Sequence, residues 1–264
     1  MYFQKTAQDF ITEEFKQAVL NGKTAEVEAM FEKEIKPDID VEIITAPGIL
    51  IAAQQENWDM VSLLYSLNAK LDVQLNTSGW TLLDECIAFA PDYVTETLME
   101  YCNLNLQTDS GETPLMVAIR KGKFEMAQKL LDTEELDLSL IDENHENIGH
   151  YAIRAGLNTM FLKLIELGLP LLQKNIKGET SIDLITDMEF RLALPEAIQK
   201  LADSGKNIIL QAKDDENKPM LVSANGEKEV KAEVTSDVVA EPVAQEQNAI
   251  KPKVSGLSAI KKKV

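Results

Sequence analysis

The sequence predicts an all-α solenoid of about six helix–turn–helix units, followed by a disordered polar tail at the C-terminus. The first observation is a helix-capping residue that returns at intervals of 32, 34 and 33 residues, at Thr81, Thr113, Asn147 and Thr180. The second is that short segments with apolar residues at helical spacing follow these positions. The third is the composition after Gly205, where polar residues dominate and helical periodicity is lost.

The central unit, residues 109–139, shows why the units must stack. Thr113 is a good N-cap because its hydroxyl can accept from free amides of the first turn, and Pro114 suits the first helical position. Gly122 can take the left-handed conformation that ends this helix. A second helix follows with an apolar face of Phe124, Ala127, Leu130 and Leu131. Each helix has only about two turns, below the roughly 12–15 residues that an isolated helix needs in water.

The motif Gly111-Glu-Thr-Pro-Leu-Met-Val-Ala118, followed by Gly122 and the pair Leu130-Leu131, resembles the ankyrin repeat, whose period is about 33 residues. Met116 departs from the family pattern, which usually has His at this position, so a polar bond inside the helix pair is lost. The resemblance implies an ankyrin-repeat solenoid that binds other proteins on a concave face. It names no particular partner.

The units before the centre match the motif less closely. In unit one, the first helix ends at Gly22, and the unit lacks a Thr-Pro start, as expected for a terminal cap. Unit two lies near residues 46–76, and its Trp58 is expected to be a core side chain. In unit three, residues 90–93 (Ala-Pro-Asp-Tyr) replace the usual Gly turn, so a slightly longer or bent link is expected.

The units after the centre lead to a C-terminal cap. Unit five begins at Asn147, a good capping residue. Unit six begins at residues 178–183, then loses its periodicity, and its helix is expected to resume at Pro195. We therefore assign residues 5–205 to the repeat array and residues 206–264 to a disordered tail.

Charge is divided unevenly between these two parts. Residues 206–264 hold 10 Lys against 9 Asp and Glu, so their net charge is +1. The total net charge is −18, so the other residues have a net charge of −19. Such acidity argues against a nucleic acid or an anionic membrane as ligand, because phosphates are repelled. No apolar run reaches the roughly 18 residues of a membrane span. The first nine residues lack the basic start and apolar core of a secretory signal peptide.

The two cysteines, Cys86 and Cys102, are expected to be buried or half-buried thiols of one repeat in a reducing compartment. Two cysteines without nearby histidines do not form a zinc site. We therefore expect a cytoplasmic protein without metal or cofactor. A monomer is favoured.

The sequence also lacks a catalytic set. The only histidines, His145 and His150, are five residues apart and do not share a helical face. We expect His150 to be structural at the start of a helix and His145 to lie in an exposed turn. No glycine-rich phosphate loop and no Gly-x-Ser-x-Gly motif occurs. These absences predict a protein that is not an enzyme, although a site assembled from loops is the remaining alternative.

The resemblance places a partner on the turn tips and on the exposed side of each first helix. Trp80 is the leading contact candidate because the repeat does not need its side chain for packing, unless it folds over a neighbouring turn. Arg120, Lys121 and Arg154 are expected to form a basic strip that could take an acidic segment, unless they are ordinary solvated helix ends. The full set of candidate partner-binding residues is Gln54, Gln55, Ser78, Trp80, Phe89, Ser110, Glu112, Arg120, Lys121, His145, Glu146, Arg154, Lys177 and Glu179.

Two functions follow from this set. The first is an adaptor that binds a protein partner on the concave face. The alternative is a bacterial effector delivered into host cells by a non-classical, type IV-like route. Some bacterial ankyrin proteins carry unstructured C-terminal export tails, and residues 206–264 are similar in being long and of mixed charge.

Overall fold

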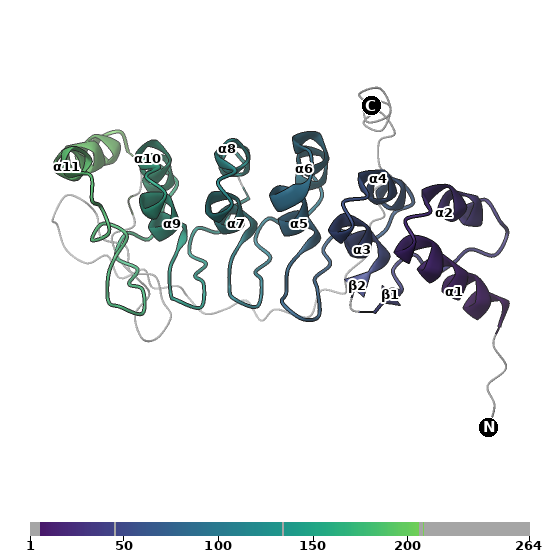
Figure 1. Ribbon diagram of the computed structural model, residues 1–264. Helices are drawn as coiled ribbons and strands as arrows, with labels where there is room; N and C mark the ends of the chain where they lie inside the picture. Colours follow the sequence, from purple (N-terminus) through teal and green to yellow (C-terminus); the bar gives the residue numbers. More distant parts are fainter. Residues whose placement is uncertain (1–5, 45, 134, 206–207, 209–264) are drawn as a thin grey trace, which may run out of the picture.

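The computed structural model describes residues 6–44, 46–133, 135–205 and 208, and these form eleven helices and one two-stranded sheet. Ten helices pair into hairpins that stack in a row, and the last helix closes the row (Figure 1). The predicted all-α solenoid is confirmed. The helices are α1 (Ala7–Leu20), α2 (Thr24–Phe31), α3 (Gly48–Gln54), α4 (Trp58–Ser66), α5 (Leu82–Phe89), α6 (Asp92–Met99), α7 (Pro114–Arg120), α8 (Phe124–Leu131), α9 (Ile148–Arg154), α10 (Asn158–Glu166) and α11 (Met188–Asp203).

The predicted caps begin the first helices of the central hairpins. Thr113 accepts a hydrogen bond from the Met116 amide at 3.4 Å, and Pro114 occupies the first turn of α7. Thr81 and Asn147 cap α5 and α9 with their own side-chain oxygens. These bonds satisfy amides that the helix itself leaves without acceptors.

The hairpin turns follow one pattern, and unit three departs from it. Gly22, Gly122 and Gly156 have φ values of 67°, 71° and 71° just after their first helices. In unit three, only Ala90 and Pro91 separate α5 from α6, and both have extended backbone. Of the two expected alternatives, a longer or a bent link, the longer one is wrong, because this link has two residues. The extended pair reverses the chain without a left-handed residue.

Stacking supplies the core. The first helices pack in the order α1, α3, α5, α7 and α9, and Phe15 of α1, Leu50 of α3 and Phe161 of α10 are fully buried in the core. Trp58 packs half-buried against this core, in line with its predicted role. Phe124, expected on the apolar face of α8, is 40 % exposed instead. Beside α3, the short strands β1 (Glu42–Ile43) and β2 (Ala46–Pro47) pair antiparallel.

Side-chain amides tie neighbouring units together across the turns. Gln74 donates to the carbonyl of Gln107 at 2.8 Å, and Gln107 donates to the carbonyl of Ile141 at 2.9 Å. On the other side of the turns, Asp72 accepts from the Asn103 amide at 2.7 Å. Each bond spans one repeat, so these side chains hold the register of the stack in addition to apolar packing.

Unit six is built differently from the expectation. Thr180 still caps, because it exchanges hydrogen bonds with Asp183, but the backbone forms turns there and not a first helix. The second helix does not resume at Pro195. It begins at Met188, capped by Asp187, and Pro195 lies inside it at an exposed position. Exposure explains the tolerance, because the carbonyl that loses its partner can bond to water.

The predicted disordered tail, residues 206–264, lies outside the described residues except for Ile208. Ile208 is buried against the core, so the packed part extends slightly beyond residue 205. Cys86 and Cys102 are free and buried, as expected, and burial raises the pKa of both thiols.

Candidate partner-binding face

The turn tips of successive repeats project along one edge of the row, below the first helices in Figure 1. Beside this edge, four predicted contact residues of units three and four come together: Trp80 precedes α5, Phe89 ends α5, Arg120 ends α7 and Lys121 follows it. The Lys121 ammonium lies 5.6 Å from the ring centroid of Trp80 and 5.1 Å from that of Phe89. The Arg120 guanidinium lies 5.7 Å from the Trp80 ring. We call Trp80, Phe89, Arg120 and Lys121 the aromatic–cation cluster.

Trp80 is the least accessible member of the cluster. Its ring is half-buried and packs against the core, so it folds over the neighbouring unit rather than standing free. The Glu85 carboxyl lies beside it, and burial raises the pKa of Glu85, although Trp80 and Lys121 oppose this rise. The indole Nε1 itself is buried and has no hydrogen-bond partner among the described residues. The exposed members of the cluster are therefore Phe89, which is 50 % exposed, Arg120 and Lys121.

Glutamate–arginine pairs occupy equivalent positions in units four and five. Glu112 accepts from Arg120 through both carboxylate oxygens, at 2.5 and 2.9 Å. Glu146 accepts from Arg154 at 2.5 and 2.9 Å. The expected basic strip is thus offset by two carboxylates. Among the described residues, Lys121 forms no ion pair and keeps its charge available.

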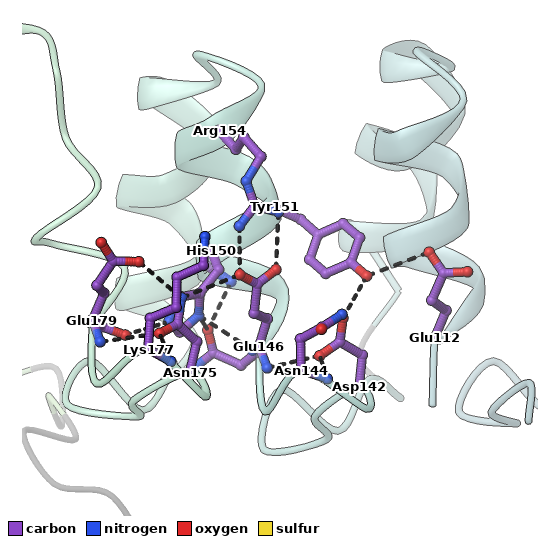
Figure 2. A network of polar contacts seen from close by, with 12 residues as sticks. Glu112, Asp142, Asn144, Glu146, His150, Tyr151, Arg154, Asn175, Lys177 and Glu179 are labelled. Atoms are coloured by element: carbon purple, nitrogen blue, oxygen red, sulfur yellow. Dashed lines mark hydrogen bonds and ion pairs between the residues drawn. The ribbon is translucent and has the colours of Figure 1, made fainter. Parts of the chain in front are cut away.

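A polar network connects these pairs to the next unit, and Figure 2 shows Glu146 at its centre. Asn175 donates to Glu146 at 3.3 Å, from the turn of unit six. Tyr151 donates to Asp142 at 2.9 Å and lies 3.3 Å from Glu112 of unit four. Burial acts to raise the pKa of Glu146, but the hydrogen bonds and charge of Arg154 outweigh it, so the pKa is lowered.

Residues 87–175 match the family model for ankyrin repeats, in three copies. This stretch consists of ankyrin repeats. The match covers the hairpin junctions that carry most of the aromatic–cation cluster and the two glutamate–arginine pairs. A search of curated proteins found no match to the chain.

The histidine inside the matched stretch, His150, is structural, as expected. His150 is fully buried, and its Nδ1 lies 2.8 Å from the side-chain oxygen of the cap Asn147. Its Nε2 lies 3.2 Å from the Glu179 carbonyl. Burial lowers the pKa of His150, although the hydrogen bond with the Glu179 carbonyl and the charge of Glu146 oppose this. His145 lies in an exposed turn with φ 59°.

The remaining candidates divide by exposure. Glu146 is 7 % exposed, and its carboxylate accepts hydrogen bonds from Arg154 inside the polar network of Figure 2. It is therefore not the exposed contact residue that was predicted. Glu112, Ser110 and Glu179 are half-buried. The candidates that lie exposed are Gln54, Gln55, Ser78, His145, Arg154 and Lys177. Gln55 also donates to the Leu20 carbonyl of the preceding unit at 3.0 Å.

Tyr151 and Asn175 were not predicted as members of this face. Tyr151 follows His150 in the repeat, one helical turn from the tip, and only stacking brings it to Glu112. No signal in a single sequence identifies such a contact between units. In the described ranges, no group of three His, Cys, Asp or Glu side chains could hold a metal ion, and no helix has the length and apolar character of a membrane span.

Proposed function

We propose that this chain is a non-catalytic adaptor whose repeats hold a segment of a partner protein along the turn tips and first helices. Ankyrin repeats are in general protein–protein interaction modules. The observation that carries the proposal is the aromatic–cation cluster, where side chains of two adjacent repeats meet at the surface. Aromatic and arginine side chains are enriched among the residues that dominate binding energy.

The charges of the cluster define the partner segment. Arg120 is paired with Glu112, whereas Lys121 lies against the Trp80 and Phe89 rings and near the Glu85 carboxyl, and it forms no ion pair among the described residues. Phe89 adds an exposed apolar ring beside this cation. We therefore propose a segment that places an apolar side chain on Phe89 and a carboxylate next to Lys121.

A peptide library tests this proposal without a known partner. The full chain is immobilised, and random peptides are selected for binding. We expect the selected peptides to combine apolar and acidic residues, and their Kd to rise at least about tenfold for Phe89→Ala and for Lys121→Glu. Trp80→Ala is a weaker test, because it also removes core packing.

Phe124→Ala is the matched control, since Phe124 is a phenylalanine of similar exposure on α8, outside the cluster. It should leave the Kd of the selected peptides unchanged. Selected peptides that bind Phe89→Ala and Lys121→Glu as tightly as the original chain would exclude this face as the binding surface.

The alternative role, a delivered effector, is a proposal about residues 206–264. Its support is composition, because this stretch has mixed charge and no large aromatic residue. Deleting residues 245–264 should abolish export from a bacterial host and leave peptide binding unchanged. Export that continues after this deletion would leave the adaptor role in the cytoplasm as the better proposal.

A further inference from the structure

The first hairpin carries a groove that the proposed partner-binding face does not include. The groove has a volume of about 430 Å³ and runs between α1 and α2. Phe10, Gln17 and Asn21 line it from one face of α1, because their spacing follows the helical repeat. Ala18 and Met30, both buried, contribute apolar surface to its floor.

Stacking explains why this groove is open. Each later hairpin is covered on this side by the one before it, since α1 packs on α3 and α2 on α4. In the described part of the chain, no hairpin precedes α1. The helix is also longer than its counterparts, with 14 residues against seven in α3. Its Phe10 is left 60 % exposed at the edge of the groove.

The rim of the groove is acidic. Glu13 and Glu14 are exposed along α1 and form no ion pair among the described residues. Glu26 of α2 also lies on the rim, but its carboxylate is paired with Lys23 at 2.8 Å. The groove therefore offers apolar surface flanked by two carboxylates that no described residue pairs.

One segment of the same chain has the complementary chemistry. Residues 250–264 contain five lysines and no acidic residue, in a protein whose net charge is −18. Val254, Leu257 and Ile260 recur every three residues, a spacing that groups apolar side chains on one face of a helical turn. We infer that residues 250–264 dock in the groove between α1 and α2. Their apolar side chains cover Phe10 and Met30, and their lysines face Glu13 and Glu14.

The chain is long enough for this contact within one molecule. The stretch between Ile208 and Ile250 is about 40 residues and can span up to about 140 Å. The row from α1 to α11 is about 50 Å long if neighbouring helices are 8–10 Å apart. A tethered segment also has an effective concentration that a separate basic peptide lacks.

Photo-crosslinking in the full chain tests the inference. Ile260 is replaced by photoreactive benzoylphenylalanine, the protein is irradiated, and mass spectrometry locates the crosslinks. We expect crosslinks to residues 10–30 of the same molecule. In the double variant Glu13→Lys and Glu14→Lys, their yield should fall about tenfold, because the rim then repels the lysines.

The control is the double variant Glu125→Lys and Glu143→Lys, which makes the same charge change at two exposed positions on other units. It should leave the crosslink yield unchanged, and circular dichroism verifies that both double variants are folded. Changing residues 261–263 from Lys to Glu should lower the yield in the original chain and restore it in the Glu13→Lys, Glu14→Lys background.

Three results would overturn the inference. The first is a set of crosslinks outside residues 10–30, and the second is a yield that the charge reversal in α1 does not change. The third is crosslinking between molecules, which a mixture of ¹⁴N- and ¹⁵N-labelled chains detects, because it would assign the groove to a second copy.

Discussion

Gly79 and Gly122 both adopt left-handed backbone, with φ of 62° and 71°, but their surroundings differ. A Cβ on Gly79 would lie 2.5 Å from the backbone nitrogen of Asp109, in the turn of the next unit. A Cβ on Gly122 would have nothing within 4 Å. Gly122 is therefore favoured by its backbone angle alone. Gly79 is favoured by its backbone angle and also by the close approach of two repeats.

We therefore expect Gly79→Ala to destabilise the protein more than Gly122→Ala does. The left-handed conformation costs an alanine about 1–2 kcal/mol at either position. At Gly79 the contact with Asp109 should add about 1–3 kcal/mol, because the next turn must move. Urea unfolding followed by circular dichroism measures both variants, and equal losses would contradict this account.

Asp84 is a buried carboxyl group whose pKa is raised by the fold. It is fully buried at the start of α5, where one carboxylate oxygen accepts from the Thr81 amide at 2.9 Å and the other has no partner in the described residues. Burial raises its pKa to about 6, against an ordinary value of 3.8. The Thr81 hydrogen bonds and Arg120 oppose this rise, and Glu112 adds to it.

This raised pKa predicts a pH dependence of stability. The folded state holds the Asp84 proton more tightly than the unfolded state, so the free energy of unfolding falls as pH rises from about 4 to about 6. Asp84→Asn should remove this loss, with a gain over the original chain of at most about 3 kcal/mol above pH 6. Urea titrations at pH 4 and pH 7 measure it.

Asp183 is the control of opposite sign. It holds the equivalent position after Thr180, and the Thr180 hydrogen bonds lower its pKa. The original chain therefore gains stability as pH rises through the range in which Asp183 ionises. Asp183→Asn lacks this gain and should be less stable than the original chain above that range. A gain for both variants at neutral pH would show that general charge reduction, and not the burial of Asp84, is responsible.

Among the helices, α9 has the most extensively bonded cap. Asn147 accepts from the Gly149 amide at 3.1 Å, and its Nδ2 donates to the Pro170 carbonyl at 2.9 Å. The same side chain pairs with His150. One residue thus starts a helix, fixes a buried imidazole and ties the exit loop of its unit to the stack.

Asn147→Ala should cost about 2–4 kcal/mol, because the loss of a helix cap adds to buried polar groups left without partners. Thr6→Ala is the control. Thr6 caps α1 with a similar hydrogen-bond pattern, but it is exposed, so about 1 kcal/mol is expected. Thermal unfolding compares the two, and similar costs would show that the bonds to Pro170 and His150 contribute little.

At the scale of the whole molecule, the main contacts of each hairpin in the described residues are with its neighbours in the row. The hairpins of α5 to α8 are covered on both sides, whereas in the described residues α1 and α2 have a stacked hairpin on one side only. In such a stack, stability is close to a sum of unit and interface contributions. The ends should therefore open more easily than the centre.

Hydrogen exchange with mass spectrometry tests this gradient. Amides of α5, α7 and α9 should exchange most slowly, and amides of α2 and α11 faster, because fewer interfaces must break to expose them. Equal protection from α1 to α11 would mean that the array opens only as a whole. Lower protection at the centre would contradict a continuous core.

Much of the hairpin architecture was predictable because it depends on local chemistry. Thr113, Pro114 and Gly122 act within a few residues of themselves, so their roles as cap, first turn and stop are legible in one sequence. The structure of unit six was harder to predict. Thr180 keeps its cap, but whether a helix continues depends on packing, and here the chain forms turns and delays the helix to Met188.

The sequence by itself determined the repeat, its caps and its apolar seams, because these arise from interactions between near neighbours. Only the tertiary structure decided which polar side chains are exposed and which are buried or paired between units. It buried Glu146, turned Trp80 onto the core and joined Tyr151 to Glu112 across repeats. The reason is that the exposure and pairing of a turn-tip side chain depend on the adjacent unit, whose position relative to it is set by stacking.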